Sequence, residues 1–123
     1  MLALNKIVAF VATKDFAKAR PFYQDKLGLK LVSEDGFALV FDIDGTMLRI
    51  AKVKDFTPAG FTILGWEVEG IEKSVSELVE KGVTFERFPG LTQDGLGIWS
   101  APGGAKVAWF KDPDGNILSL SQL

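Results

Sequence analysis

The sequence predicts an α+β fold built from two tandem βαβββ units, and three observations carry this prediction. Strand-like segments rich in branched and aromatic residues surround two helix-like segments, and the order of elements in the first half recurs in the second. Late in each half comes a matching turn followed by a strand: Asp44-Gly45-Thr46-Met47-Leu48-Arg49-Ile50 and Asp114-Gly115-Asn116-Ile117-Leu118-Ser119-Leu120. With 123 residues the chain suits a single domain, 1–123, with units 1–54 and 61–123 and a linker at about 53–60.

The first unit begins with a strand at 5–11, which is followed by a helix. Asp15 is the expected N-cap, four apolar residues follow at helical spacing, and Gly28 ends the helix. Pro21 conflicts with a helix interior because it lacks an N–H group, so we expect a loose first turn and a regular helix from about Pro21. Strands at about 29–33, 37–42 and 46–52 complete the unit.

The second unit repeats this order with an insertion. A strand at 62–68 precedes a helix whose apolar face includes Ile71 and Val75, and Gly82 ends this helix. Another strand is expected to begin at Val83. About sixteen extra residues, compared with the first unit, fall in a glycine-rich loop at 88–104 that holds Trp99 and is flexible enough to act as a lid.

Alternation along the strands sorts their side chains into two faces. One face is wholly apolar and should pack against the helices; its members are Ile7, Ala9, Val11, Leu48, Ile50, Leu64, Trp66, Val68, Leu118 and Leu120. The other, called the mixed face below, combines apolar and polar side chains: Lys6, Val8, Phe10, Met47, Arg49, Ala51, Ile63, Gly65, Glu67, Ile117, Ser119 and Ser121. A sheet with one face in water has this composition. So has a ligand cleft, which would form if the two units together made one curved mixed sheet with the helices on its outer face.

The composition excludes several kinds of chemistry. The chain has no cysteine and no histidine, so catalytic triads, Cys-His pairs and histidine or thiolate metal sites are impossible. The net charge of −2 and the scattered basic residues argue against nucleic acid as a partner. No apolar run is long enough for a membrane helix and no signal peptide is recognisable, so we expect a cytoplasmic protein.

Three segments resemble the vicinal oxygen chelate superfamily, which includes glyoxalase I, extradiol dioxygenases and bleomycin-resistance proteins. They are FYQDKLGL at 22–29, WEVEG at 66–70 and DPDGNIL at 112–118, and the resemblance covers nearly the whole chain. It implies the duplicated βαβββ architecture and a homodimer. The DPDGN residues themselves are those of a tight turn rather than of a calcium loop.

The resemblance also implies four metal-ligand positions, and this chain departs from the family at all of them. The positions fall on Lys6, Arg49, Ile63 and Ser119, none of which is a strong metal ligand, and two of which are cations that repel a metal ion. We therefore expect no metal and no other cofactor. All four belong to the mixed face, which places the expected cleft there.

The candidate ligand-binding residues are Lys6, Phe10, Arg49, Ile63, Trp99 and Ser119. Lys6 and Arg49 suit an anionic group, although their charged ends could equally lie in water. Glu67 is the candidate catalytic base, and the alternative is that it pairs with one of these cations. Trp99 is either a ligand contact or part of the core.

Three functions stay open at this point. The first is a metal-free protein that binds a small anionic or aromatic molecule. The second is a metal-independent isomerase, epimerase or lyase in which Lys6 and Arg49 stabilise an enolate-like charge. The third is a non-catalytic dimeric interaction subunit.

Overall fold

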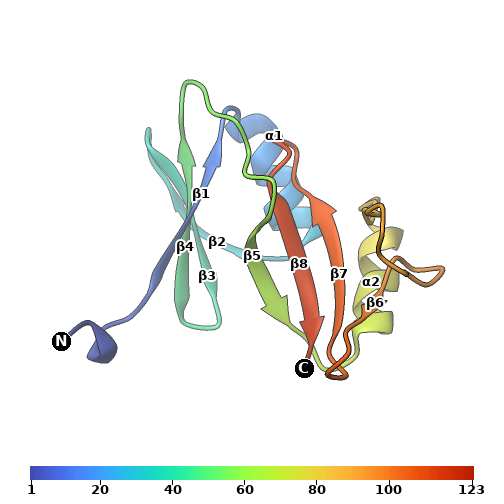
Figure 1. Cartoon of the computed structure of the whole chain (residues 1–123). Helices are drawn as coiled ribbons and strands as arrows, with labels where there is room; N and C mark the ends of the chain where they lie inside the picture. The colour runs from blue at the N-terminus through green and yellow to red at the C-terminus, as the bar shows by residue number, and fades with distance from the viewer. The chain divides into compact units, whose positions relative to one another are not determined.

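The computed structural model describes all residues, 1–123, and divides the chain into two compact units, Met1–Thr57 and Pro58–Leu123. Each unit contains one four-stranded mixed sheet and helical segments in the predicted order (Figure 1). The tandem α+β duplication is therefore confirmed. No helix has the length and apolar character needed to cross a membrane.

Unit 1 carries its four strands in the order β1-β4-β3-β2. The strands are β1 (Val8–Thr13), β2 (Lys30–Glu34), β3 (Ala38–Ile43) and β4 (Thr46–Lys52), and a 3-10 turn, Leu2–Leu4, precedes them. β1 and β4 are parallel and the other two pairings are antiparallel. The predicted strand at 5–11 thus begins later than expected, which leaves Lys6 just before β1.

The helical segment between β1 and β2 consists of an α-helical part and a π-helical part. Asp15 is the N-cap as expected, because its Oδ1 accepts a hydrogen bond of 2.9 Å from the Ala17 N–H. The prediction of a regular helix from Pro21 is wrong: the α-helical part is α1 (Phe16–Arg20), and Pro21–Lys26 forms a π-helix. Pro21 has no N–H to donate to the preceding turn, and the chain continues with wider bonds such as that from the Leu27 N–H to the Phe22 carbonyl, 3.0 Å.

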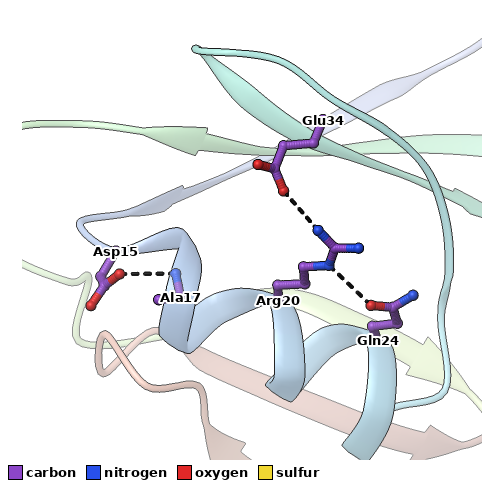
Figure 2. A network of polar contacts seen from close by, with 5 residues as sticks. All are labelled: Asp15, Ala17, Arg20, Gln24 and Glu34. Carbon is purple, nitrogen blue, oxygen red and sulfur yellow. Dashed lines mark hydrogen bonds and ion pairs between the residues drawn. The ribbon is translucent and has the colours of Figure 1, made fainter.

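Arg20 ties this helix to β2 (Figure 2). Its Nη1 lies 3.1 Å from Glu34 Oε1, and its Nε donates to Gln24 Oε1 at 3.2 Å. Tyr23, in the same helical segment, is fully buried, with its ring against those of Phe22 and Phe41. The helix therefore covers the sheet face that carries Phe41.

Alternation assigns the buried face of the unit 1 sheet correctly except at its beginning. The predicted members Val11, Leu48 and Ile50 are buried, and so are Leu39 and Phe41 of β3, which pair with Ile50 and Leu48 but were not assigned to a face from the sequence. Ile7 was expected among them but is 75% exposed, because β1 starts only at Val8.

Unit 2 carries its strands in the order β5-β8-β7-β6. The elements are β5 (Thr62–Glu67), α2 (Ile71–Glu80), β6 (Trp99–Ser100), β7 (Lys106–Lys111) and β8 (Ile117–Gln122). β5 and β8 are parallel, and α2 lies against β7 and β8. The side chain of Gln122 accepts a hydrogen bond from the Ile71 N–H and so fixes the start of α2.

The strand expected from Val83 does not form. Only a single bridge joins Phe85 to Phe110, and the fourth strand of the sheet is instead β6, from within the glycine-rich loop. The Gln93 side chain accepts from the Phe88 N–H and donates to the carbonyls of Glu86 and Gly97. One amide side chain therefore satisfies backbone groups that a longer strand would have paired.

The DPDGN segment is a turn, as its composition predicts. Asp112 is buried, and its Oδ1 accepts from the N–H groups of Asp114 and Asn116. Its Oδ2 accepts from the Asn116 side chain at 2.8 Å. β8 begins directly after the turn, and its residues Ile117–Leu120 are all buried.

Candidate functional site

Three side chains form a row across the mixed face of the unit 1 sheet. Phe10 of β1 is the register partner of Arg49 on β4, and Arg49 is the partner of Val40 on β3. Register partners share a face, so an exposed ring, a guanidinium and a buried aliphatic side chain stand next to one another. Phe10 is 64% exposed although it lies within a strand. Two of the candidate ligand-binding residues, Phe10 and Arg49, are therefore neighbours on one face of the unit 1 sheet.

Arg49 has no carboxylate at ion-pair distance within unit 1, where the ion pairs of Lys14 and Arg20 involve other residues. Its charge does act on Asp35, in the turn before β3. The pKa of Asp35 is lowered mainly by the N–H groups of Phe37 and Ala38, which donate to its carboxylate, and Arg49 lowers it a little further. Arg49 is thus half-buried, and its guanidinium forms no ion pair or side-chain hydrogen bond within unit 1.

Lys6 precedes β1, which begins at Val8, and has no register partner in the sheet. It lines a pocket of about 400 Å³ whose wall comes entirely from unit 1. Two further ionisable residues line the pocket, Lys30 at the start of β2 and Asp42 near the end of β3. The sequence reasoning missed both, and it named Glu67 as the only acid of the mixed face.

The register of the hairpin could have placed Asp42 on this face. Asp44 and Gly45 both have positive φ, 48° and 90°, as a two-residue hairpin turn requires. Such a turn pairs Ile43 with Thr46, and therefore Asp42 with Met47. Since Met47 was already assigned to the mixed face, Asp42 belongs there too.

In unit 2, Ser119 occupies the middle of the mixed face. It is the register partner of Gly65 on β5 and of Trp109 on β7. A Cβ atom at Gly65 would come within 2.6 Å of the Ser119 Oγ, so the absent side chain leaves a notch above the hydroxyl. No hydrogen bond involves this hydroxyl, although Ser119 is only 6% exposed.

Aromatic rings border this notch. The ring of Trp109 lies 6.1 Å from that of Trp99 and 5.4 Å from that of Phe88, centroid to centroid. Trp99 comes from β6, where it is the register partner of Val107. It therefore joins a cluster with the face residue Trp109, which the sequence reasoning did not include. Trp99 also lines a pocket of about 490 Å³ formed by the loop before β6.

The two remaining candidates lie at opposite ends of β5. Glu67 is exposed, is paired in register with Ser121, and forms no ion pair within unit 2. Ile63 lies at a bulge: Thr62 and Leu64 pair with the consecutive residues Ile117 and Leu118, so Ile63 has no partner. Alternation therefore does not fix the face of Ile63.

The donor set does not fit a metal ion. No group of three or more Asp, Glu, His or Cys side chains comes together anywhere in residues 1–123. The four positions that the resemblance assigns to metal ligands carry two cations, an aliphatic chain and a hydroxyl. Divalent ions require anionic or strongly donating ligands, which these residues do not supply.

Comparisons with known proteins agree with the fold and with the motifs. Residues 3–120 match the profile of the Glyoxalase/Bleomycin resistance protein/Dioxygenase superfamily. The Bacillus subtilis protein YraH is 30% identical over 125 residues, which cover 89% of this chain and 91% of YraH.

Solved structures share the fold at low identity. A glyoxalase family protein from Bacillus anthracis superimposes with a TM-score of 0.76 at 18% identity, over 96% of this chain and 93% of that one. A superfamily member from Sphaerobacter thermophilus gives a TM-score of 0.75 at 22% identity, with both chains covered completely. With its duplicated βαβββ units, its motifs and a profile match over nearly its whole length, the chain belongs to the glyoxalase/bleomycin resistance protein/dioxygenase superfamily.

Proposed function

We propose that this chain is a metal-free binding protein of its superfamily, which captures a small molecule on the mixed faces of its sheets. The observation that carries the proposal is the chemistry of the four positions Lys6, Arg49, Ile63 and Ser119. They replace metal ligands by groups that bind organic molecules directly. A cation can hold an anionic group, a hydroxyl can donate or accept a hydrogen bond, and an aliphatic chain provides apolar contact.

The unit 1 face supports an anionic and partly aromatic ligand. Arg49 lacks a carboxylate partner, and the exposed Phe10 ring is next to it in the register. A planar guanidinium matches the two oxygens of a carboxylate, and the ring can pack against an apolar or aromatic body. The pair therefore suits a ligand that carries both features.

The unit 2 face supports the same kind of ligand in a different way. The Ser119 hydroxyl, without a hydrogen-bond partner, lies beneath the notch at Gly65, and Trp109 is next to it in the register. A polar atom that enters the notch gains a hydrogen bond while the rest of the ligand contacts the indole ring.

Tryptophan emission tests this proposal because Trp99 and Trp109 belong to the unit 2 face. We expect aromatic carboxylates in a panel of small molecules to change the emission until it saturates. The same change should occur after the protein has been dialysed against EDTA. Elemental analysis should find no stoichiometric metal. The variant Ser119→Ala should bind more weakly, whereas Ser76→Ala, at an exposed position on α2, should bind normally. Silence across a broad panel, or binding that requires added metal, would refute the proposal.

A metal-independent isomerase, epimerase or lyase is the second candidate, and the position of Glu67 favours it. This carboxylate is exposed on β5, two residues from Gly65, and no cation of unit 2 pairs with it. It could take a proton from a carbon next to a carbonyl group. The C–H electron pair would move onto the carbonyl oxygen, and a cation beside that oxygen would stabilise the resulting enolate charge.

The variant Glu67→Gln separates the two functions. If the chain is an enzyme, this change should abolish turnover and leave ligand binding intact, since the amide keeps the shape but cannot accept the proton. Glu69→Gln changes an exposed acid just after β5 and is the matched control. Unchanged turnover in Glu67→Gln would dismiss Glu67 as the base.

A further inference from the structure

We propose that the pocket between Lys6 and Lys30 in unit 1 binds a small organic anion with an apolar body, a carboxylate or a phosphate monoester. This inference rests on the proposed binding function and names the chemical class of its ligand. It concerns a site formed by unit 1 alone, and it assigns a binding role to Lys30, which none of the sequence motifs contains.

The register of the sheet builds this pocket. Lys30 pairs with Asp42, Asp42 pairs with Met47, and Met47 pairs with Val8, so one row of side chains crosses all four strands of unit 1. Lys6 precedes Val8 by two residues and lines the same pocket. Two amino groups from opposite edges of the sheet therefore border one pocket.

The local charge is positive, and the amino groups are available. Neither Lys6 nor Lys30 forms an ion pair within unit 1. Asp42 is the only acid in the lining, and its Oδ1 accepts a hydrogen bond of 3.1 Å from the Gly45 N–H in the β3–β4 turn. Two cations against one carboxylate leave a net positive charge at the pocket, which selects an anion.

The rest of the wall is apolar. Val8, Val32 and Met47 line the pocket with side chains that are about half exposed. The volume of about 400 Å³ falls within the range of small-molecule sites, which is roughly 300–1,000 Å³. An inorganic anion would leave this apolar wall in water, whereas an alkyl or aryl chain would cover it.

Octanoate, octyl phosphate and octanamide are suitable probes for the full-length chain, with calorimetry for affinity and amide NMR shifts for location. We expect octanoate or octyl phosphate to bind, to shift the amides of Val8, Lys30 and Met47, and to weaken as salt is raised. Octanamide, the neutral matched probe, should bind at least fivefold more weakly than octanoate. The ratio of octanoate to octyl phosphate affinity distinguishes the two anion classes.

Matched variants test the residues. Lys6→Gln and Lys30→Gln should each weaken anion binding by roughly fivefold, the upper end for an exposed ion pair. Lys18→Gln, on the exposed side of α1, should not change it. Val32→Thr should also weaken binding, whereas Val79→Thr, at a half-exposed valine on α2, should not.

The inference would be overturned by octanamide binding as tightly as octanoate, by full affinity in the Lys6→Gln/Lys30→Gln double variant, or by no binding of either anion. If anions shift only unit 2 amides such as that of Ser119, this pocket is wrong and the proposed function stands. If neither these probes nor the aromatic panel binds, both this inference and the proposed function are wrong.

Discussion

Gly65 is the residue whose replacement most directly probes the mixed face of unit 2. A strand usually favours a side chain over glycine, but here a Cβ would lie 2.6 Å from Ser119 Oγ and 3.3 Å from the Ser119 carbonyl oxygen. We expect Gly65→Ala to lower the free energy of unfolding by about 1 kcal/mol, because Ser119 is too enclosed to yield without cost. Urea denaturation measures the change.

The double variant Gly65→Ala/Ser119→Ala gives this prediction its control. Removing the Oγ leaves the Ser119 Cβ as the nearest side-chain atom, at 3.8 Å, so the second change should restore most of the lost stability. Additive losses in the double variant would show that the hydroxyl is not what excludes a side chain at Gly65.

Among the elements, the helical segment Phe16–Lys26 depends on Arg20 for its attachment to β2 (Figure 2). The Arg20–Glu34 ion pair joins side chains that are 48% and 42% exposed, so water screens it. A double-mutant cycle with Arg20→Ala and Glu34→Ala should give a coupling energy of about 0.5 kcal/mol. A cycle with Lys73 and Glu77, a more exposed and longer pair on α2, should give less. Equal coupling energies in the two cycles would show that the Arg20–Glu34 contact stabilises the fold no more than an exposed ion pair within one helix.

For the whole molecule, we predict a homodimer. The apolar side chains Leu2 and Leu4 are 84% and 90% exposed, and Ile7 and Phe10 are exposed as well. Exposed apolar residues gathered in one segment mark an interaction surface. Light scattering at micromolar concentration should give twice the chain mass of 13.4 kDa.

The variant Leu2→Ser/Leu4→Ser should shift this equilibrium towards the monomer, and Val79→Ser on α2 should not. A wild-type chain that stays monomeric would contradict the prediction. A tight dimer that binds none of the probes would favour the third function, a non-catalytic interaction subunit.

The sequence by itself determined the duplication, the order of the elements in unit 1 and the alternation of side chains along β4. These features depend on local periodicity and on turn residues such as Asp44 and Gly45, which act within a few residues of chain. The beginning of β4 at Thr46 and its end at Lys52 agree with the prediction for the same reason. The superfamily motifs are equally local, and the absence of histidine follows from the composition alone.

Only the tertiary structure decided the features that depend on pairing between distant segments. The bulge at Ile63 arises from the register with β8, and β6 forms because Trp99 pairs with Val107 while Gln93 satisfies the neighbouring backbone. Lys30 lines the same pocket as Lys6 because three successive strand pairings place Lys30 in one row with Val8, two residues after Lys6. Periodicity describes one strand at a time, whereas a binding site is made by the strands together.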